Sequence, residues 1–227
     1  IIPLWLEGQN LELHQSALRS VLIFSASVFL LTIKLSALPL LLLAGWLVWR
    51  DVQNQPLRVI RWGFLGMVLV LPWLARNVIL SGYLIYPFPA LDWFNVDWKI
   101  PYETAVREAQ IIRAWARLPN VDASEVLNMP LSEWLPVWFS DRTTNQRLIL
   151  VLAAASPLGM IGVWLLARLK KWGLTRQPFS WAGAYLFGMA GGLYWLFNAP
   201  DLRFGYGWVM LLIGLPLAGL MSGMAEK

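Results

Sequence analysis

The longest apolar run of the chain, residues 17–49, most restricts its possible folds, because Lys34 stands near its centre. As a single helix this run would be about 50 Å long at about 1.5 Å per residue, which exceeds a hydrocarbon core of about 30 Å. A break at Lys34, with Pro39 in the first turn of the next helix, divides the run into two shorter helices. The sequence therefore predicts helices at about 17–33 and 36–49, with Lys34 at a membrane interface.

The composition also indicates an integral membrane protein. Hydrophobic residues make up 58% of the 227 residues and charged residues only 14%, whereas charged residues are about 25% of soluble domains. Many of the 15 tryptophans stand at the ends of apolar runs, as in an interfacial aromatic belt. The net charge of +5 arises from basic residues beside apolar segments, which favours lipid headgroups over nucleic acid as the partner.

Four further apolar segments predict spanning helices, at about 59–80, 147–168, 179–197 and 205–222. The expected fold class is all-α: a polytopic membrane protein with about six transmembrane helices and one helical extracytoplasmic loop. The chain then divides into N-terminal membrane helices (1–81), the loop with amphipathic helices (82–146) and C-terminal membrane helices (147–227).

Basic residues in the short links predict the orientation in the membrane. If the helices alternate, the links and the C-terminus with these residues share one side, which the positive-inside rule makes cytoplasmic: Arg50, Arg58, Arg61, Arg168, Lys170, Lys171, Arg176 and Lys227. The long loop and the turns at Lys34 and at residues 198–204 then face outward. We expect this topology in a bacterial cytoplasmic membrane.

The polar region has helical patterning of its own. Residues 101–118 show the apolar spacing of a helix. Residues 122–125 form a capping-box pattern, in which Asp122 is expected to accept a hydrogen bond from the backbone N–H near Glu125. Residues 130–139 are amphipathic and rich in tryptophan, which is typical of a helix lying along the outer membrane interface.

Three basic residues, Lys34, Arg76 and Arg203, are expected at the outward ends of apolar helices. A cation near the bilayer costs free energy unless it reaches water or meets an anion, and arginine binds phosphate in a bidentate way. These three residues are therefore candidate contacts for a lipid phosphate. The alternative is that they extend to the interface or form local ion pairs, for instance Arg203 with Asp201.

Two carboxylates, Asp92 and Asp97, lie among aromatic residues of the polar region. Partial desolvation would suit either of them to act as a general base, so both are candidate catalytic residues. Aspartates in such a setting also form turns and lie at membrane interfaces.

Metal and nucleotide chemistry have no support in the sequence. The chain has no cysteine and a single histidine, His14, and it contains no phosphate-binding glycine-rich motif. We expect no cofactor, and no sequence motif supports a site for a divalent metal.

Three short segments resemble GT-C-type membrane glycosyltransferases. Residues 32–36, TIKLS, resemble a turn between two short helices of that superfamily. Residues 72–87, which begin PWLARN and end GYLIYP, resemble the helix end that leads into its extracytoplasmic region. Residues 200–206, PDLRFGY, are similar to a late turn with an arginine and an aromatic residue.

The resemblance implies sugar transfer from a polyprenyl-phosphate carrier to an extracytoplasmic glycan, lipid or protein acceptor. In the superfamily the catalytic carboxylate belongs to a loop after the first helix, and no such loop precedes residue 17. We therefore expect a C-terminal part of such an enzyme, in which Lys34, Arg76 and Arg203 contact carrier phosphate and Asp92 and Asp97 lie on the acceptor side. The alternative is a non-enzymatic transporter or envelope-assembly subunit that binds an anionic lipid.

Overall fold

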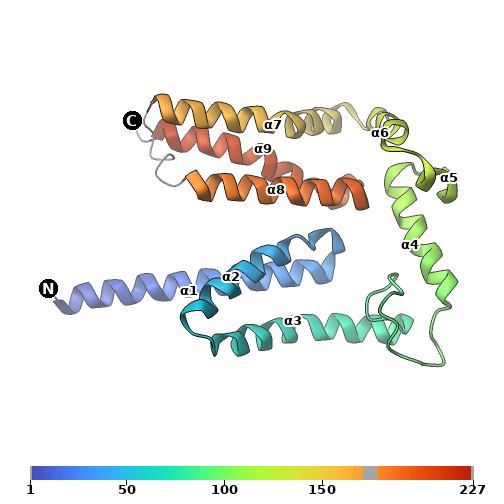
Figure 1. Cartoon of the computed structure of the whole chain (residues 1–227), viewed down its shortest axis with the longest axis horizontal. Coiled ribbons are helices and arrows are strands. Elements are labelled where there is room, and N and C mark those ends of the chain that lie inside the picture. The colour runs from blue at the N-terminus through green and yellow to red at the C-terminus, as the bar shows by residue number, and fades with distance from the viewer. Residues whose placement is uncertain (1, 171–177, 226–227) are drawn as a thin grey trace. The chain divides into compact units, whose positions relative to one another are not determined.

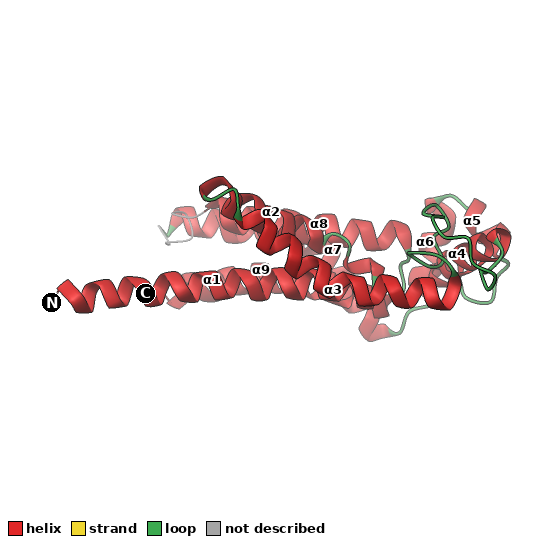
Figure 2. Cartoon of the chain, turned by 90° about the horizontal axis from the view of Figure 1, so that it is seen from below, coloured by secondary structure: helices red, strands yellow, loops and turns green. Residues whose placement is uncertain are grey.

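The computed structural model describes the backbone of residues 2–170 and 178–225, with side chains from residue 17 onward except residues 54, 178–181 and 225. The described part consists of helices and connecting loops, with no strand, which confirms the all-α class (Figure 2). The chain forms two compact units, Ile1–Val106 and Arg107–Lys227. The basic residues predicted at positions 171, 176 and 227 lie outside the described residues.

The first unit contains α1 (Ile2–Ile33), the 3₁₀ helix η1 (Leu35–Ala37), α2 (Leu40–Asn54) and α3 (Arg58–Ser81). Figure 1 shows α2 folding back along α1, and α3 running in the same direction as α1. Apolar side chains from all three helices form the core: Phe24, Val28, Ala44, Leu47 and Trp62. The C-terminal ends of α1 and α3 therefore share one end of this unit.

The predicted break at Lys34 is confirmed, since α1 ends at Ile33 and Lys34 has an extended backbone (φ −146°, ψ 122°). The predicted start of the first helix at residue 17 is wrong, because α1 begins at Ile2. Pro3 lies in the first turn, where proline is tolerated, and the polar residues that follow continue the helix beyond the apolar run. The second helix begins at Leu40 rather than residue 36, because η1 precedes it and Pro39 occupies its N-cap.

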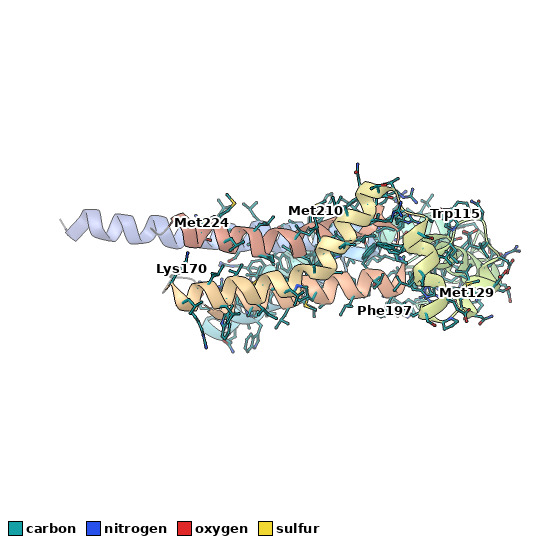
Figure 3. All side chains as sticks on the ribbon, turned by 90° about the horizontal axis from the view of Figure 1, so that it is seen from above. Trp115, Met129, Lys170, Phe197, Met210 and Met224 are labelled. Atoms are coloured by element: carbon teal, nitrogen blue, oxygen red, sulfur yellow. The ribbon has the colours of Figure 1, made fainter. Side chains whose placement is uncertain are left out.

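The second unit contains most of α4 (Tyr102–Arg117), then α5 (Ala123–Asn128), α6 (Leu131–Ser140), α7 (Thr144–Leu169), α8 (Pro178–Asn198) and α9 (Leu202–Ala225). α9 packs against both α7 and α8. In Figure 3, Lys170 and Met224 mark one end of this bundle and Phe197 marks the other. α3, α7, α8 and α9 each begin and end within one turn of the bounds predicted from the sequence.

Two helix starts carry caps that the sequence encodes. Asp122 is confirmed as the N-cap of α5, because its carboxylate accepts a 2.8 Å hydrogen bond from the Ser124 N–H. The hydrogen bonds from Ser124 hold the pKa of Asp122 below its ordinary value. α7 begins with a reciprocal capping box between Thr143 and Gln146.

Large rings packed against glycines hold α8 to α9. A Cβ on Gly191 of α8 would lie 2.2 Å from the ring of Trp208 on α9, and one on Gly205 of α9 would lie 2.1 Å from the ring of Trp195 on α8. Both tryptophans are buried. The contact is reciprocal, so each helix supplies one ring and one glycine.

Among the residues that the structure describes, three helical segments are long and apolar enough to cross a membrane: Arg58–Ser81, Thr144–Leu169 and Leu202–Met224. The apolar part of α1, Ala17–Ile33, is shorter. By the length and composition of its helices the chain is suited to a membrane.

Candidate functional site

The candidate site begins where α3 ends, at Gly82. This residue has a left-handed backbone (φ 79°) and forms the C-cap, with its N–H donating to the carbonyl oxygen of Val78. A Cβ at Gly82 would lie 2.7 Å from the Cγ of Lys99, so the chain passes too close here for a side chain. Glycine therefore allows both the turn out of α3 and the close approach of Lys99.

Residues 98–100 return to the end of α3 and dock there. The indole N–H of Trp98 donates to the carbonyl oxygen of Val78 (3.4 Å), and the backbone N–H of Ile100 donates to the carbonyl oxygen of Ser81 (3.1 Å). The hydroxyl of Tyr83, a side chain only 1% exposed, donates to the carbonyl oxygen of Ile100 (3.0 Å). These contacts fix the loop between residues 82 and 101 to the helix.

Lys99 is the centre of this loop. Its ammonium group forms an ion pair with Asp92, donates to the carbonyl oxygen of Phe94 (2.9 Å) and lies 5.1 Å from the centre of the Tyr83 ring. The Asp92 carboxylate is therefore neutralised by a neighbouring cation. Asp97 is exposed and has no side-chain hydrogen bond or ion pair with the described residues.

Arg76 lies on α3 shortly before this loop. Its side chain is exposed and has no hydrogen bond or ion pair with the described part of the chain. Beside it in sequence, the amide Nδ2 of Asn77 is buried and also has no partner among the described residues. Trp98 donates its hydrogen bond to Val78, two residues after Arg76, and this contact brings the segment with Asp97 to the same end of α3.

The other two predicted phosphate contacts lie in different units. Lys34 is exposed in the turn after α1, at the end of the first unit where α3 also ends (Figure 1). Arg203 belongs to the second unit and forms a 2.6 Å ion pair with Asp201. The local ion pair weighed as an alternative for Arg203 is therefore present.

The Asp201 carboxylate accepts several hydrogen bonds from Arg203. Burial alone would raise its pKa, but hydrogen bonds from the Arg203 side chain and N–H, together with the charges of Arg203 and Arg142, lower it below the ordinary value. Buried indoles anchor the same turn, since Trp138 donates to the carbonyl oxygen of Pro200 and Trp195 to that of Asp201, each at 2.8 Å. Hydrogen bonds from side chains therefore reach two successive carbonyl groups of the turn before α9.

Each unit has an apolar groove. The groove of the second unit has a volume of about 580 Å³ and is bounded by α6, α7, α8 and α9. The groove of the first unit, of about 720 Å³, is bounded by α1, α2 and α3. Both are lined almost entirely by hydrocarbon, which suits acyl or isoprenoid chains.

Several arginine–tryptophan contacts were missed by the sequence reasoning. Arg50 lies over Trp46 within α2 (5.0 Å), and Arg168 lies over Trp164 within α7 (3.9 Å). Arg142, just after the end of α6, lies over Trp138 (5.3 Å). The spacing of four residues is visible in the sequence and could have predicted these pairs. The contact of Arg117 with Trp134 (5.0 Å) joins two helices and has no such signal.

The tryptophans of the predicted interfacial helix point inward, since Trp134 and Trp138 of α6 are each 2% exposed. Among the residues whose positions are described, no three histidine, aspartate or glutamate side chains are close enough together to hold a metal ion.

Comparison with known proteins gives a family and no closer relative. No curated protein and no solved structure matches the chain. A family model described as "Domain of unknown function (DUF8201)" matches residues 1–210. Since the match covers most of the 227 residues, the chain belongs to the DUF8201 family.

Proposed function

We propose that this chain is the membrane part of a GT-C-like glycosyltransferase that binds a polyprenyl-phosphate-linked sugar at the extracytoplasmic face of a bacterial cytoplasmic membrane. About six helices cross the membrane in this proposal. The loop after α3 faces outward and the C-terminus is cytoplasmic. The acceptor is an extracytoplasmic glycan, lipid or protein.

The observation that carries the proposal is the exposure of the Arg76 side chain and its lack of a hydrogen-bond or ion-pair partner in the described chain. Arg76 lies on a helix apolar enough to span a membrane, and a hydrogen-bonded loop follows it. A guanidinium near the bilayer surface favours a phosphate, which it binds bidentately. The apolar groove of the same unit, lined in part by Leu71 and Leu74 of α3, offers room for the carrier's hydrocarbon chain.

In the proposed reaction, Asp97 acts as a general base on the acceptor hydroxyl. Arg76 and Lys34 stabilise the negative charge that develops on the departing lipid phosphate. Asp92 has a positioning role, because its ion pair with Lys99 braces the loop that carries Asp97. Arg203, which is paired with Asp201 in the second unit, is proposed as a separate contact for a lipid phosphate.

The alternative function is lipid binding without catalysis, as in a transporter or an envelope-assembly subunit. The neutralisation of Asp92 by Lys99 favours it, because only one of the two candidate bases is left without a cationic partner. The two functions differ in a direct assay with a polyprenyl-phosphate-linked sugar. Release of polyprenyl phosphate that Asp97→Asn abolishes supports the enzyme, whereas binding without release supports the alternative.

Binding of farnesyl phosphate to the purified protein tests the phosphate contact. Arg76→Ala should weaken binding about tenfold, which corresponds to about 1.4 kcal/mol. Arg61→Ala, an exposed arginine near the other end of α3, is the matched control and should leave binding unchanged. Farnesol, which lacks the phosphate, should bind both proteins equally. Unchanged binding of farnesyl phosphate by Arg76→Ala would falsify the proposal.

A further inference from the structure

The apolar groove of the second unit has one end inside the helical bundle. Ser156 of α7 and Tyr185 of α8 both line the groove, and a 2.7 Å hydrogen bond between their hydroxyl groups joins the two helices. Both side chains are buried. From this pair the groove extends to Trp138 and Phe139 of α6, at the end of the unit where α7 begins. The hydrogen-bonded pair therefore marks the inner end of a groove whose walls are almost entirely hydrocarbon.

Arg147 of α7 adjoins the other end of the groove. Residues three, four and seven positions further along the helix share its face, and all of them line the groove: Leu150, Val151 and Ala154. The Arg147 side chain is exposed and has no hydrogen bond or ion pair with the described residues. By contrast, Arg142, just after α6, is paired with Asp141 (3.4 Å). Within the described chain, an arginine without a counter-ion therefore lies beside the apolar groove.

The length of the groove matches one leaflet of a bilayer. α7 is long and apolar enough to cross a membrane, and Arg147 lies in its first turn. A long side chain on a helix leans toward the N-terminal end, which directs a cationic head to the headgroup layer. The rise along α7 from Arg147 to Ser156 is about 14 Å at about 1.5 Å per residue, which is about half of a hydrocarbon core of about 30 Å. The groove therefore covers the depth that one acyl chain fills.

We propose that this groove holds one acyl chain of an anionic phospholipid, whose phosphate contacts Arg147. The guanidinium group binds phosphate oxygens in a bidentate way, and the hydrocarbon walls accept the chain. A zwitterionic headgroup would bring a second cation next to Arg147, so a lipid with a net negative charge fits better. An isoprenoid carrier is longer than the groove. The inference does not rest on the proposed function, because it uses none of the residues assigned to the polyprenyl-phosphate contact.

Native mass spectrometry of the full chain in detergent tests the headgroup contact. Dioleoyl phosphatidylglycerol should bind about tenfold more tightly than dioleoyl phosphatidylcholine, and Arg147→Gln should remove this preference. Arg107→Gln, at an exposed arginine of α4 outside the groove, should keep it. Arg76→Ala should also keep it, so this inference and the proposed function can fail separately. Equal binding of the two lipids by wild type, or an undiminished preference in Arg147→Gln, overturns the proposal.

Two neighbouring alanines of α7 test the seat of the acyl chain. Ala154 lines the groove and Ala155 does not, and both are exposed, so tryptophan at either position should leave the chain folded. Ala154→Trp fills the groove and should weaken phosphatidylglycerol binding about tenfold, whereas Ala155→Trp should not. Equal binding by these two variants overturns the groove as the seat of the chain. Farnesyl phosphate that binds wild type more tightly than phosphatidylglycerol, and is weakened by Ala154→Trp, overturns the choice of a phospholipid.

Discussion

The indole Nε1–H of Trp138 donates a 2.8 Å hydrogen bond to the carbonyl oxygen of Pro200, 62 residues further along the chain. Both residues are buried, and the Trp138 ring meets that of Trp195 edge-on with centroids 6.1 Å apart. Since Trp195 donates to Asp201, the two tryptophans together hold successive carbonyl groups of one turn. The polar region before α7 is thereby tied to the connection between the last two helices.

Trp138→Phe should destabilise the second unit by about 1–3 kcal/mol, because the buried carbonyl oxygen of Pro200 loses its hydrogen-bond donor. Thermal unfolding of the detergent-solubilised protein measures the loss. Trp164→Phe is the matched control, since that indole is 43% exposed, and it should change stability little. Equal effects of the two substitutions would show that the hydrogen bond contributes nothing specific.

Gly205→Ala should destabilise the packing of α8 on α9 by about 1–3 kcal/mol, because the added methyl group would overlap the buried ring of Trp195. Gly207→Ala, two residues later, is the control: nothing lies within 4 Å of its Cβ position. That change should be neutral or stabilising by up to about 1 kcal/mol, as alanine favours a helix over glycine. Unfolding temperatures of both variants check the difference, and a neutral Gly205→Ala would contradict it.

Sequence patterns alone could predict the helices and some of their ends. The break at Lys34 follows from helix length against bilayer thickness, and the cap at Asp122 follows from local hydrogen-bonding chemistry. The N-terminal extension of α1 was missed because hydropathy marks an apolar run and does not mark where a helix begins. Local patterns therefore predict elements better than they predict continuations through polar residues.

The candidate site was predictable only residue by residue. Arg76 and Lys34 could be placed at one end of the first unit from the direction of successive helices. The ion pair of Asp92 with Lys99 and the docking of Tyr83 on Ile100 depend on a folded loop, whose path no periodic pattern encodes. Arg117 was overlooked for the same reason, because its partner ring comes from another helix.

Asp51→Asn should lower the stability of the first unit near neutral pH by about 0.5–1 kcal/mol, since a partly exposed ion pair contributes little. The Asp51 carboxylate accepts from Arg58 (2.5 Å) and from the indole of Trp62 (2.9 Å). Burial alone would raise its pKa, but these two partners and the charge of Arg50 hold it below the ordinary value of 3.8.

The pH dependence of this effect has a definite sign. The lowered pKa means that the contribution of Asp51 is fully present above pH 3.8 and is lost as the pH falls through the value in the folded protein. The difference in unfolding temperature between wild type and Asp51→Asn should therefore be constant from about pH 7 to pH 5 and shrink below pH 3.8. Asp97→Asn, at an exposed site without a partner, should show no such difference. A gap that persists unchanged below pH 3 would contradict the assigned cause.

Gly82→Ala should detach the loop that carries Asp97 from the end of α3. A left-handed backbone (φ 79°) strains any L-side chain, and the new methyl group would meet the side chain of Lys99 at 2.7 Å and its Cα at 3.0 Å. The contact with backbone leaves little room for adjustment, so the expected cost is about 1–3 kcal/mol. Gly63→Ala, in the helix interior with open space at its Cβ position, is the matched control.

Limited proteolysis of the folded protein measures this detachment. In wild type and Gly63→Ala, the hydrogen bonds of Tyr83 and Ile100 should protect the segment between residues 82 and 101 from cleavage. In Gly82→Ala the same segment should be cut sooner, while the helical bundle of the second unit keeps its resistance. Cleavage at the wild-type rate would mean that docking of the loop does not depend on glycine at this turn.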